Sequence, residues 1–555
     1  MKSAVNRTRE GGKFLSGVSL LTLSAVAVKV IGLAYRIPML RVLGTAGMGY
    51  FNTAYEVYAL LCVLSTAGLP VAMSVLLAGG DGAPAYRAAY RALSRRIYRV
   101  SLAVFCTIGV LGTAALLLPA RLWAEMLGNP DAAASIRAVS PAVLAVCLAG
   151  AARGYFQGLS DMKPTAVSQV IEALGKLILG LAFAYFAARR GAPLPVTAAC
   201  AVLGLTAGTV ASAAWLLFRL ARQDRRAGDA LPVDMPPVPL PGRRHILRRL
   251  AAVALPVTLS AGVISLTKCV DLALILRRLQ DAGVSGDRAN ALYGCYSTLA
   301  VPVFNILPSL SASVAMSLVP VLSGAVRRLR TGTAAGECAE AARQARRACA
   351  GALGLTLAFA VPAGLGLFGL GGDVLTLLFR GQPEAVAEAT PWLRLLGLAV
   401  PSACLITVTG AMLQAAGHAA APVVSMLIGT SVKAVLAYRL LALPDWGMLA
   451  APVSSLCCDT LILLCNCILL ARFAPDILPH GRALAGLFIL PIALALPAVA
   501  LAPRLCACVG FGGDGVPDIL CRIGGTALLY GTGAAAVCLP AGRYIKKGRK
   551  TEHDI

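Results

Sequence analysis

Apolar stretches of roughly twenty residues recur about fourteen times along nearly the whole chain, separated by short polar gaps. A stretch of that length is long enough to cross the hydrocarbon core of a bilayer as a helix. The pattern therefore predicts an all-α polytopic membrane protein with about 14 transmembrane helices. The predicted spans are residues 14–38, 48–78, 98–119, 138–158, 164–187, 195–218, 248–276, 290–323, 347–370, 390–414, 420–441, 446–471, 481–502 and 518–541.

Composition and charge agree with this pattern. Hydrophobic residues make up 58% of the chain and charged residues only 14%, too little polar surface for a soluble protein. The formal charge of +25 lies in short loops rather than on one basic face, which argues against a nucleic-acid partner. The gaps on the side of the membrane that carries the N-terminus contain roughly 30 Lys and Arg, and those on the other side roughly 10. We therefore expect a protein of the bacterial cytoplasmic membrane with both termini in the cytoplasm. The basic gaps also suit anionic lipid head groups.

The seventeen cysteines do not indicate a metal site. Most lie inside apolar spans, and with only four histidines none has the spacing of zinc ligands. They are expected to act as small apolar side chains. Only Cys506, Cys508 and Cys521 lie near an outward loop, where thiols can oxidise.

The chain contains an internal repeat. Residues 71–74 and 314–317 share the sequence Val-Ala-Met-Ser, and Tyr50 and Tyr293 precede them by the same interval. The sequence thus predicts two six-helix bundles in one orientation, related by a pseudo-twofold axis along the membrane normal, with a cleft between them. The expected parts are an N-terminal bundle (1–220), a cytoplasmic Arg/Pro-rich linker (221–247), a C-terminal bundle (248–475), two additional helices (476–541) and a basic cytoplasmic tail (542–555).

Several motifs resemble the polysaccharide-biosynthesis branch of the multidrug/oligosaccharidyl-lipid/polysaccharide exporter superfamily, and within it the stage V sporulation protein B group. The motifs are Lys29-Val-Ile-Gly, Tyr35-Arg-Ile-Pro, Ser65 to Ser74, Gly154 to Gly158, Pro164 to Glu172 and Leu318-Val-Pro. The resemblance implies a V-shaped flippase, similar to multidrug exporters and lipid II flippases, that moves undecaprenyl-linked saccharides such as polysaccharide or peptidoglycan precursors by alternating access. It also implies a setting in spore cortex synthesis and a lipid-tail groove at the two additional helices.

Two other functions stay open beside the flippase. One is a cation-coupled multidrug antiporter of the same superfamily, and the other is a non-transporting scaffold that works with cell-wall synthesis proteins. An enzyme is not expected, because the outward gaps are short and no nucleophile–base pattern is present.

Charged residues inside the spans are the candidates for binding an anionic, lipid-linked substrate. A charge at a helix centre costs roughly 2.5–3.5 kcal/mol on insertion scales, so an unpaired one should face a wet cavity. Lys29 and Arg36 lie seven residues apart on one helix face and suit a pyrophosphate. The alternatives are that Arg36 extends to the membrane interface or that Glu56 pairs with one of them.

Further candidates lie on later spans. Gln169, Glu172 and Lys176 form one polar stripe, although the last two also have the spacing of an internal ion pair. Lys268 lies near Asp271 on another span. Lys433 corresponds to Lys176 in the repeat but lacks an acid one turn earlier, where Gly429 stands.

No cofactor is expected. Transport energy is expected from Na⁺, H⁺ or the membrane potential, which is worth about 2.3 kcal/mol per charge per 100 mV. Asp271 and Asp459 are the candidate oxygen ligands for a coupling cation. The alternative is that each aspartate is a counter-ion of a nearby lysine.

Overall fold

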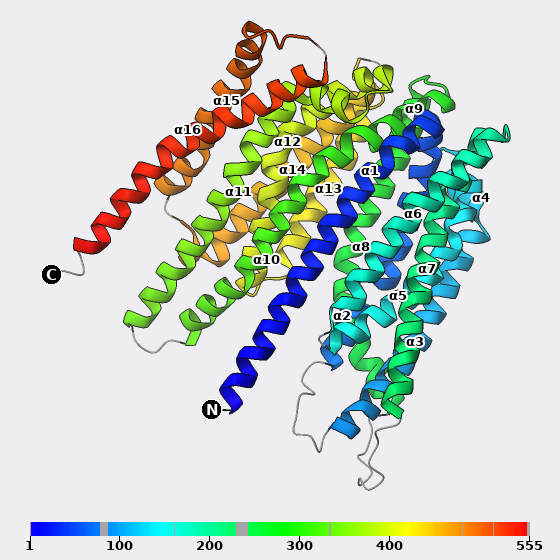
Figure 1. Cartoon of the computed structure of the whole chain (residues 1–555), viewed down its shortest axis with the longest axis horizontal. Coiled ribbons are helices and arrows are strands. Elements are labelled where there is room, and N and C mark those ends of the chain that lie inside the picture. The colour runs from blue at the N-terminus through cyan, green and yellow to red at the C-terminus, as the bar shows by residue number, and fades with distance from the viewer. Residues whose placement is uncertain are drawn as a thin grey trace. The chain divides into compact units, whose positions relative to one another are not determined.

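The computed structural model describes residues 2–77, 87–159, 161–228, 242–331, 335–443, 445–479, 481–513 and 515–551 (Figure 1). All regular structure in these ranges is helical. Contacts divide the chain into two compact units, Met1–Gly294 and Cys295–Ile555. The all-α polytopic fold expected from the sequence is confirmed, with twelve helical segments of the described ranges long and apolar enough to cross a membrane.

The helices of the first unit pack around α5 and α7. In chain order the unit contains α1 (Lys2–Thr66), α2 (Leu69–Leu77), α3 (Arg87–Leu117), α4 (Ala120–Met126), η2 (Pro130–Ala132), α5 (Ala133–Gly158), α6 (Lys163–Arg189), α7 (Leu194–Gly228), α8 (Arg243–Asp281) and most of α9 (Gly286–Cys295). Helix α8 packs on α1, α2 and α3 and so belongs to this unit. The predicted domain boundaries and the pseudo-twofold stay predictions, and residues 229–241 of the predicted linker lie outside the described part.

The second unit is built on α11 and α12. It contains η3 (Tyr296–Ala300), α10 (Val301–Thr331), α11 (Ala335–Leu378), α12 (Pro383–Ala415), α13 (Ala421–Leu440), η4 (Gly447–Leu449), α14 (Ala450–Phe473), η5 (Pro475–Ile477), α15 (Gly481–Cys508) and α16 (Val516–Thr551). The two C-terminal helices pack on each other and on α11. The Arg522 guanidinium of α16 donates to both carboxylate oxygens of Asp373 on α11, at 3.0 and 2.8 Å. This bidentate ion pair attaches α16 to α11 at that point.

The predicted spans 14–38 and 48–78 are separated in the structure at Gly44. The chain folds back there, since the rings of Tyr35 and Phe51, on either side of this glycine, have centroids 6.0 Å apart. Gly44 has a φ of 63° and a ψ of −177°, which are not helical, so the range of α1 holds two helices that meet at this residue. The helical run then breaks between Thr66 and Leu69, where the Gly68 amide donates to the Thr258 hydroxyl of α8 at 3.2 Å. A Cβ at Gly68 would overlap the carbonyl oxygen of Ala254. The break therefore depends on glycine because α8 passes directly against the backbone.

Glycines also bring α6 and α7 into backbone contact. A Cβ at Gly204 of α7 would overlap the backbone of Gly180 on α6, and a Cβ at Gly208 would lie 2.8 Å from the amide nitrogen of Lys176. Small residues at such a seam allow two membrane helices to approach closely, which gains dispersion contacts. The seam positions α6, which carries three of the predicted site residues.

We expect Gly204→Ala to lower the free energy of unfolding by about 1–3 kcal/mol, because the added methyl meets backbone atoms that cannot rotate away. Thermal unfolding of the purified protein in detergent measures this. Gly351→Ala in α11 is the matched control, since nothing lies within 4 Å of its added Cβ. Equal unfolding temperatures for the two variants would contradict a closely packed seam.

Candidate functional site: a cationic cluster in the first unit

Lys176 of α6 lies against three aromatic rings of α1. Its ammonium nitrogen is 5.1 Å from the ring centroid of Tyr35, 5.5 Å from that of Phe51 and 4.8 Å from that of Tyr55. Tyr35 and Phe51 are buried, whereas Tyr55 and Lys176 are half-buried. The negative ring faces attract the cation without neutralising it. The three rings thus hold the Lys176 side chain in place.

Glu172, one helical turn before Lys176, pairs with Arg153 of α5. The Arg153 guanidinium donates to the carboxylate at 2.9 Å, to the Ser168 hydroxyl at 2.9 Å and to the Ser212 hydroxyl at 3.2 Å. These bonds join α5, α6 and α7. The ion pair in the structure is therefore Arg153–Glu172, which leaves Lys176 with the rings of α1 rather than with a carboxylate of its own helix.

The sequence interpretation missed Arg153. A signal was available, since this arginine lies inside the predicted span 138–158, directly before the Gly154 to Gly158 motif. A charge inside a span is expensive and indicates a partner or a function.

Arg36 and Glu56 bring α1 and α8 into the same cluster. Glu56 is within electrostatic range of Arg36, Lys268 and Asp271. Arg36 in turn interacts with Tyr35, Tyr55 and Tyr293 and with the Lys176 charge. Arg36 and Glu56 are half-buried, and Lys268 is exposed. We define the cationic cluster as Arg36, Glu56, Arg153, Glu172, Lys176, Lys268 and Asp271, in which four cations face three carboxylates.

Two other predicted residues lie on helices of the cluster. Lys29 is exposed on α1, two turns before Arg36. The Gln169 side-chain oxygen accepts a bond from the Ser24 hydroxyl of α1 at 3.4 Å, so that Gln169 faces α1. The structure thus places predicted site residues of α1, α6 and α8 in one unit. Their role in substrate binding stays a prediction.

The remaining predicted residues belong to the second unit. Lys433 lies on α13 and Asp459 on α14, and both are half-buried. On α14 the buried Asn466 donates to the Thr409 hydroxyl at 3.2 Å. Among the residues that the structure describes, no three His, Cys, Asp or Glu side chains group as metal ligands. A coupling-cation role for Asp271 or Asp459 stays a prediction.

Comparison with known proteins supplies the family. Residues 14–326 match the profile described as polysaccharide biosynthesis protein, and residues 298–439 match the MatE profile. The first match covers more than half of the chain. The chain belongs to the polysaccharide biosynthesis protein family. The resemblance inferred from the sequence motifs is confirmed.

Three relatives in Bacillus subtilis (strain 168) align with most of the sequence of this family member. Stage V sporulation protein B is 24% identical over 83% of this chain and 84% of its own. Lipid II flippase MurJ is 26% identical over 78% of each chain. The uncharacterized membrane protein YabM is 25% identical over 79% of this chain and 76% of its own.

Two solved structures share the fold. The inward closed conformation of lipid II flippase MurJ matches with a TM-score of 0.68 at 12% identity, over 93% of this chain and 98% of that one. An inward-facing multidrug resistance MATE family transporter matches with a TM-score of 0.57 at 16% identity, over 80% and 98%. This polysaccharide biosynthesis family member therefore shares its fold with a membrane flippase and with a multidrug transporter.

Proposed function

We propose that this family member is a flippase that moves an anionic, lipid-linked saccharide across the bacterial cytoplasmic membrane by alternating access. The carrier is undecaprenyl pyrophosphate, and the cargo is a polysaccharide or peptidoglycan precursor, with spore cortex synthesis as its setting. The observation that carries the proposal is the cationic cluster, which places four cations among helices α1, α5, α6 and α8 of one unit. The named functions of two relatives, lipid II flippase and sporulation protein, support it.

The charge balance favours this cargo over a drug cation. An exporter of cationic drugs needs carboxylates to attract its substrate, whereas the carboxylates of the cluster lie among a larger number of cations. The scaffold alternative makes a different prediction for variants that lack the charges of the cluster. A scaffold keeps its function in such variants, and a flippase does not.

The test is translocation in liposomes that contain the purified chain. The probe is a fluorescent polyprenyl pyrophosphate saccharide, and the comparison lipid carries the same saccharide without phosphate. We expect movement of the pyrophosphate probe to exceed that of the comparison lipid about tenfold, because a charge-assisted contact is worth about 1.5–3 kcal/mol. Lys29→Ala with Arg36→Ala should abolish the difference.

The matched control for that double variant is Lys163→Ala with Arg189→Ala. These residues lie at the two ends of α6, and the variant removes the same charge outside the cluster. Export of a cationic dye without movement of any saccharide lipid would overturn the flippase in favour of the antiporter. The absence of all movement by a folded protein would favour the scaffold.

Three further parts of the proposal concern energy, orientation and partners. We propose coupling to a Na⁺ or H⁺ gradient or to the membrane potential, with Asp271 and Asp459 as cation ligands, and cytoplasmic N- and C-termini next to anionic lipids. Cell-wall synthesis proteins are the proposed protein partners. Imposing each gradient separately on the liposomes distinguishes the couplings, since only the coupled gradient accelerates net transport.

A further inference from the structure

Helices α15 and α16 carry facing thiols near the turn that joins them. The Cys521 sulfur of α16 lies 3.3 Å from the Cys506 sulfur of α15. Both thiols are free, and Cys506 is only 7% exposed while Cys521 is half-buried. The spacing along each helix explains the contact, since Ala502 and Cys506 share one face of α15, and Cys521 and Gly525 share one face of α16.

The approach of the two helices fixes this register. A Cβ at Gly525 would lie 3.3 Å from the Cys506 sulfur and 3.8 Å from the Ala502 side chain, so that the helices are close where the thiols meet. Arg522, the neighbour of Cys521, is bonded to Asp373 of α11 and also donates to the Gly513 carbonyl at 3.0 Å. These bonds oppose rotation of the first turns of α16 about the helix axis, so that Cys521 stays directed at α15.

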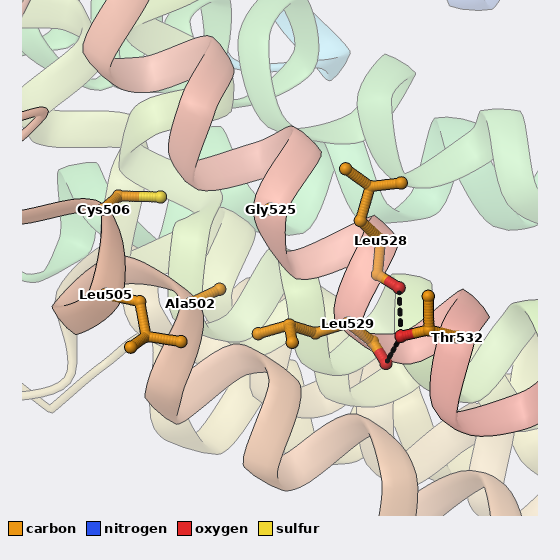
Figure 2. Close-up of a pocket in the computed structure, with 7 residues that line it drawn as sticks. All are labelled: Ala502, Leu505, Cys506, Gly525, Leu528, Leu529 and Thr532. Carbon is orange, nitrogen blue, oxygen red and sulfur yellow. Dashed lines mark hydrogen bonds between the residues drawn. The ribbon is translucent and has the colours of Figure 1, made fainter. Parts of the chain in front are cut away.

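Cys506 lines an apolar groove between the same helices. The groove has a volume of about 270 Å³, and Cys506, Gly525 and Leu528 are among its lining residues (Figure 2). Figure 2 shows Cys506 on α15 with its sulfur directed toward the helix that carries Gly525. A reagent that enters the groove therefore reaches the Cys506 sulfur.

We propose that Cys506 and Cys521 are a disulfide-forming pair that covalently joins α15 to α16 at the edge of this groove. One thiol attacks a disulfide of the oxidant and forms a mixed disulfide, and the second thiol displaces the remaining half. The chain loses two protons and two electrons, and the oxidant, a low-molecular-weight or protein disulfide, takes them up and is released as two thiols. Under the proposed topology the turn faces outward, opposite the basic tail, on the side where disulfides persist.

The test uses the full chain in liposomes with oxidised glutathione as the oxidant. Free thiols are then blocked with N-ethylmaleimide, and the unreduced protein is digested and analysed by mass spectrometry. We expect a Cys506–Cys521 peptide that dithiothreitol separates, formed at least about tenfold faster than any disulfide of Cys508, because preset contact removes the search for a partner.

Cys508→Ser is the matched control, since this thiol is exposed in the last turn of α15. It should leave the cross-link unchanged, whereas Cys506→Ser and Cys521→Ser should each remove it while eluting as folded protein. Modification of Cys508 by the oxidant with no Cys506–Cys521 peptide would overturn the proposal. A cross-link from Cys508 to Cys521 at an equal rate would overturn it as well.

Discussion

Replacing Lys176 with methionine should reduce translocation of a polyprenyl pyrophosphate saccharide at least about tenfold. Methionine retains an apolar stem that packs against the three rings but removes the ammonium, whose nitrogen lies 4.8 Å from the Tyr55 ring centroid. A hydrogen bond to a charged group contributes about 1.5–3 kcal/mol, and about 1.4 kcal/mol corresponds to a factor of ten. The measurement is the initial rate of probe movement in liposomes with equal amounts of folded protein.

The control for this change is Lys163→Met. Lys163 lies on the same helix, is exposed and stands outside the cluster, so its loss should leave the rate unchanged. Lys176→Arg keeps the charge and should retain more activity than Lys176→Met. Unchanged transport by Lys176→Met would show that the aromatic contact serves the fold alone.

Replacing Glu172 with glutamine should lower the free energy of unfolding by about 2–3 kcal/mol. The Arg153 side chain is 18% exposed and that of Glu172 is 31% exposed, so water screens the pair only in part. Removing the carboxylate leaves a guanidinium that cannot lose its charge among membrane helices. The two serine hydroxyls that remain provide hydrogen bonds but no opposite charge.

Arg153→Met should cost less than Glu172→Gln, because the freed carboxylate retains Lys176 one turn away on α6. Denaturant unfolding in detergent of both single variants and the double variant gives the coupling energy of the pair. Glu340→Gln is the control, since its pair with Arg343 has side chains 70% and 66% exposed and should contribute little. Equal stability of Glu172→Gln and Glu340→Gln would contradict a structural role for Arg153–Glu172.

The fold could be predicted because bilayer thickness dictates helix length. The predicted spans 164–187 and 420–441 correspond closely to α6 (Lys163–Arg189) and α13 (Ala421–Leu440). The first two predicted spans, 14–38 and 48–78, are also two helices in the structure, because the gap between them contains the non-helical Gly44. Hydropathy locates this gap but not its geometry, which is a tight reversal at Gly44, where a φ of 63° favours glycine.

The pairing of charges was less predictable than their presence. Spacing along α6 favoured Glu172–Lys176, but spacing describes only one helix. The structure adds α5, whose Arg153 reaches Glu172, and α1, whose rings hold Lys176. Which helices become neighbours depends on long-range packing, and the glycines that bring α6 and α7 together carry no charge pattern that reveals their role.

The glycine seam restricts how this unit can move. If α7 slid along α6 by one helical turn, side chains would be driven into the backbone that Gly204 and Gly208 now leave open. We therefore expect the two helices to move together as one rigid pair. Lys176 and Glu172 lie on α6, and Arg153 is bonded to Glu172 and to Ser212 of α7. In the proposed alternating access we therefore expect these cations to change their orientation together, without being separated from one another.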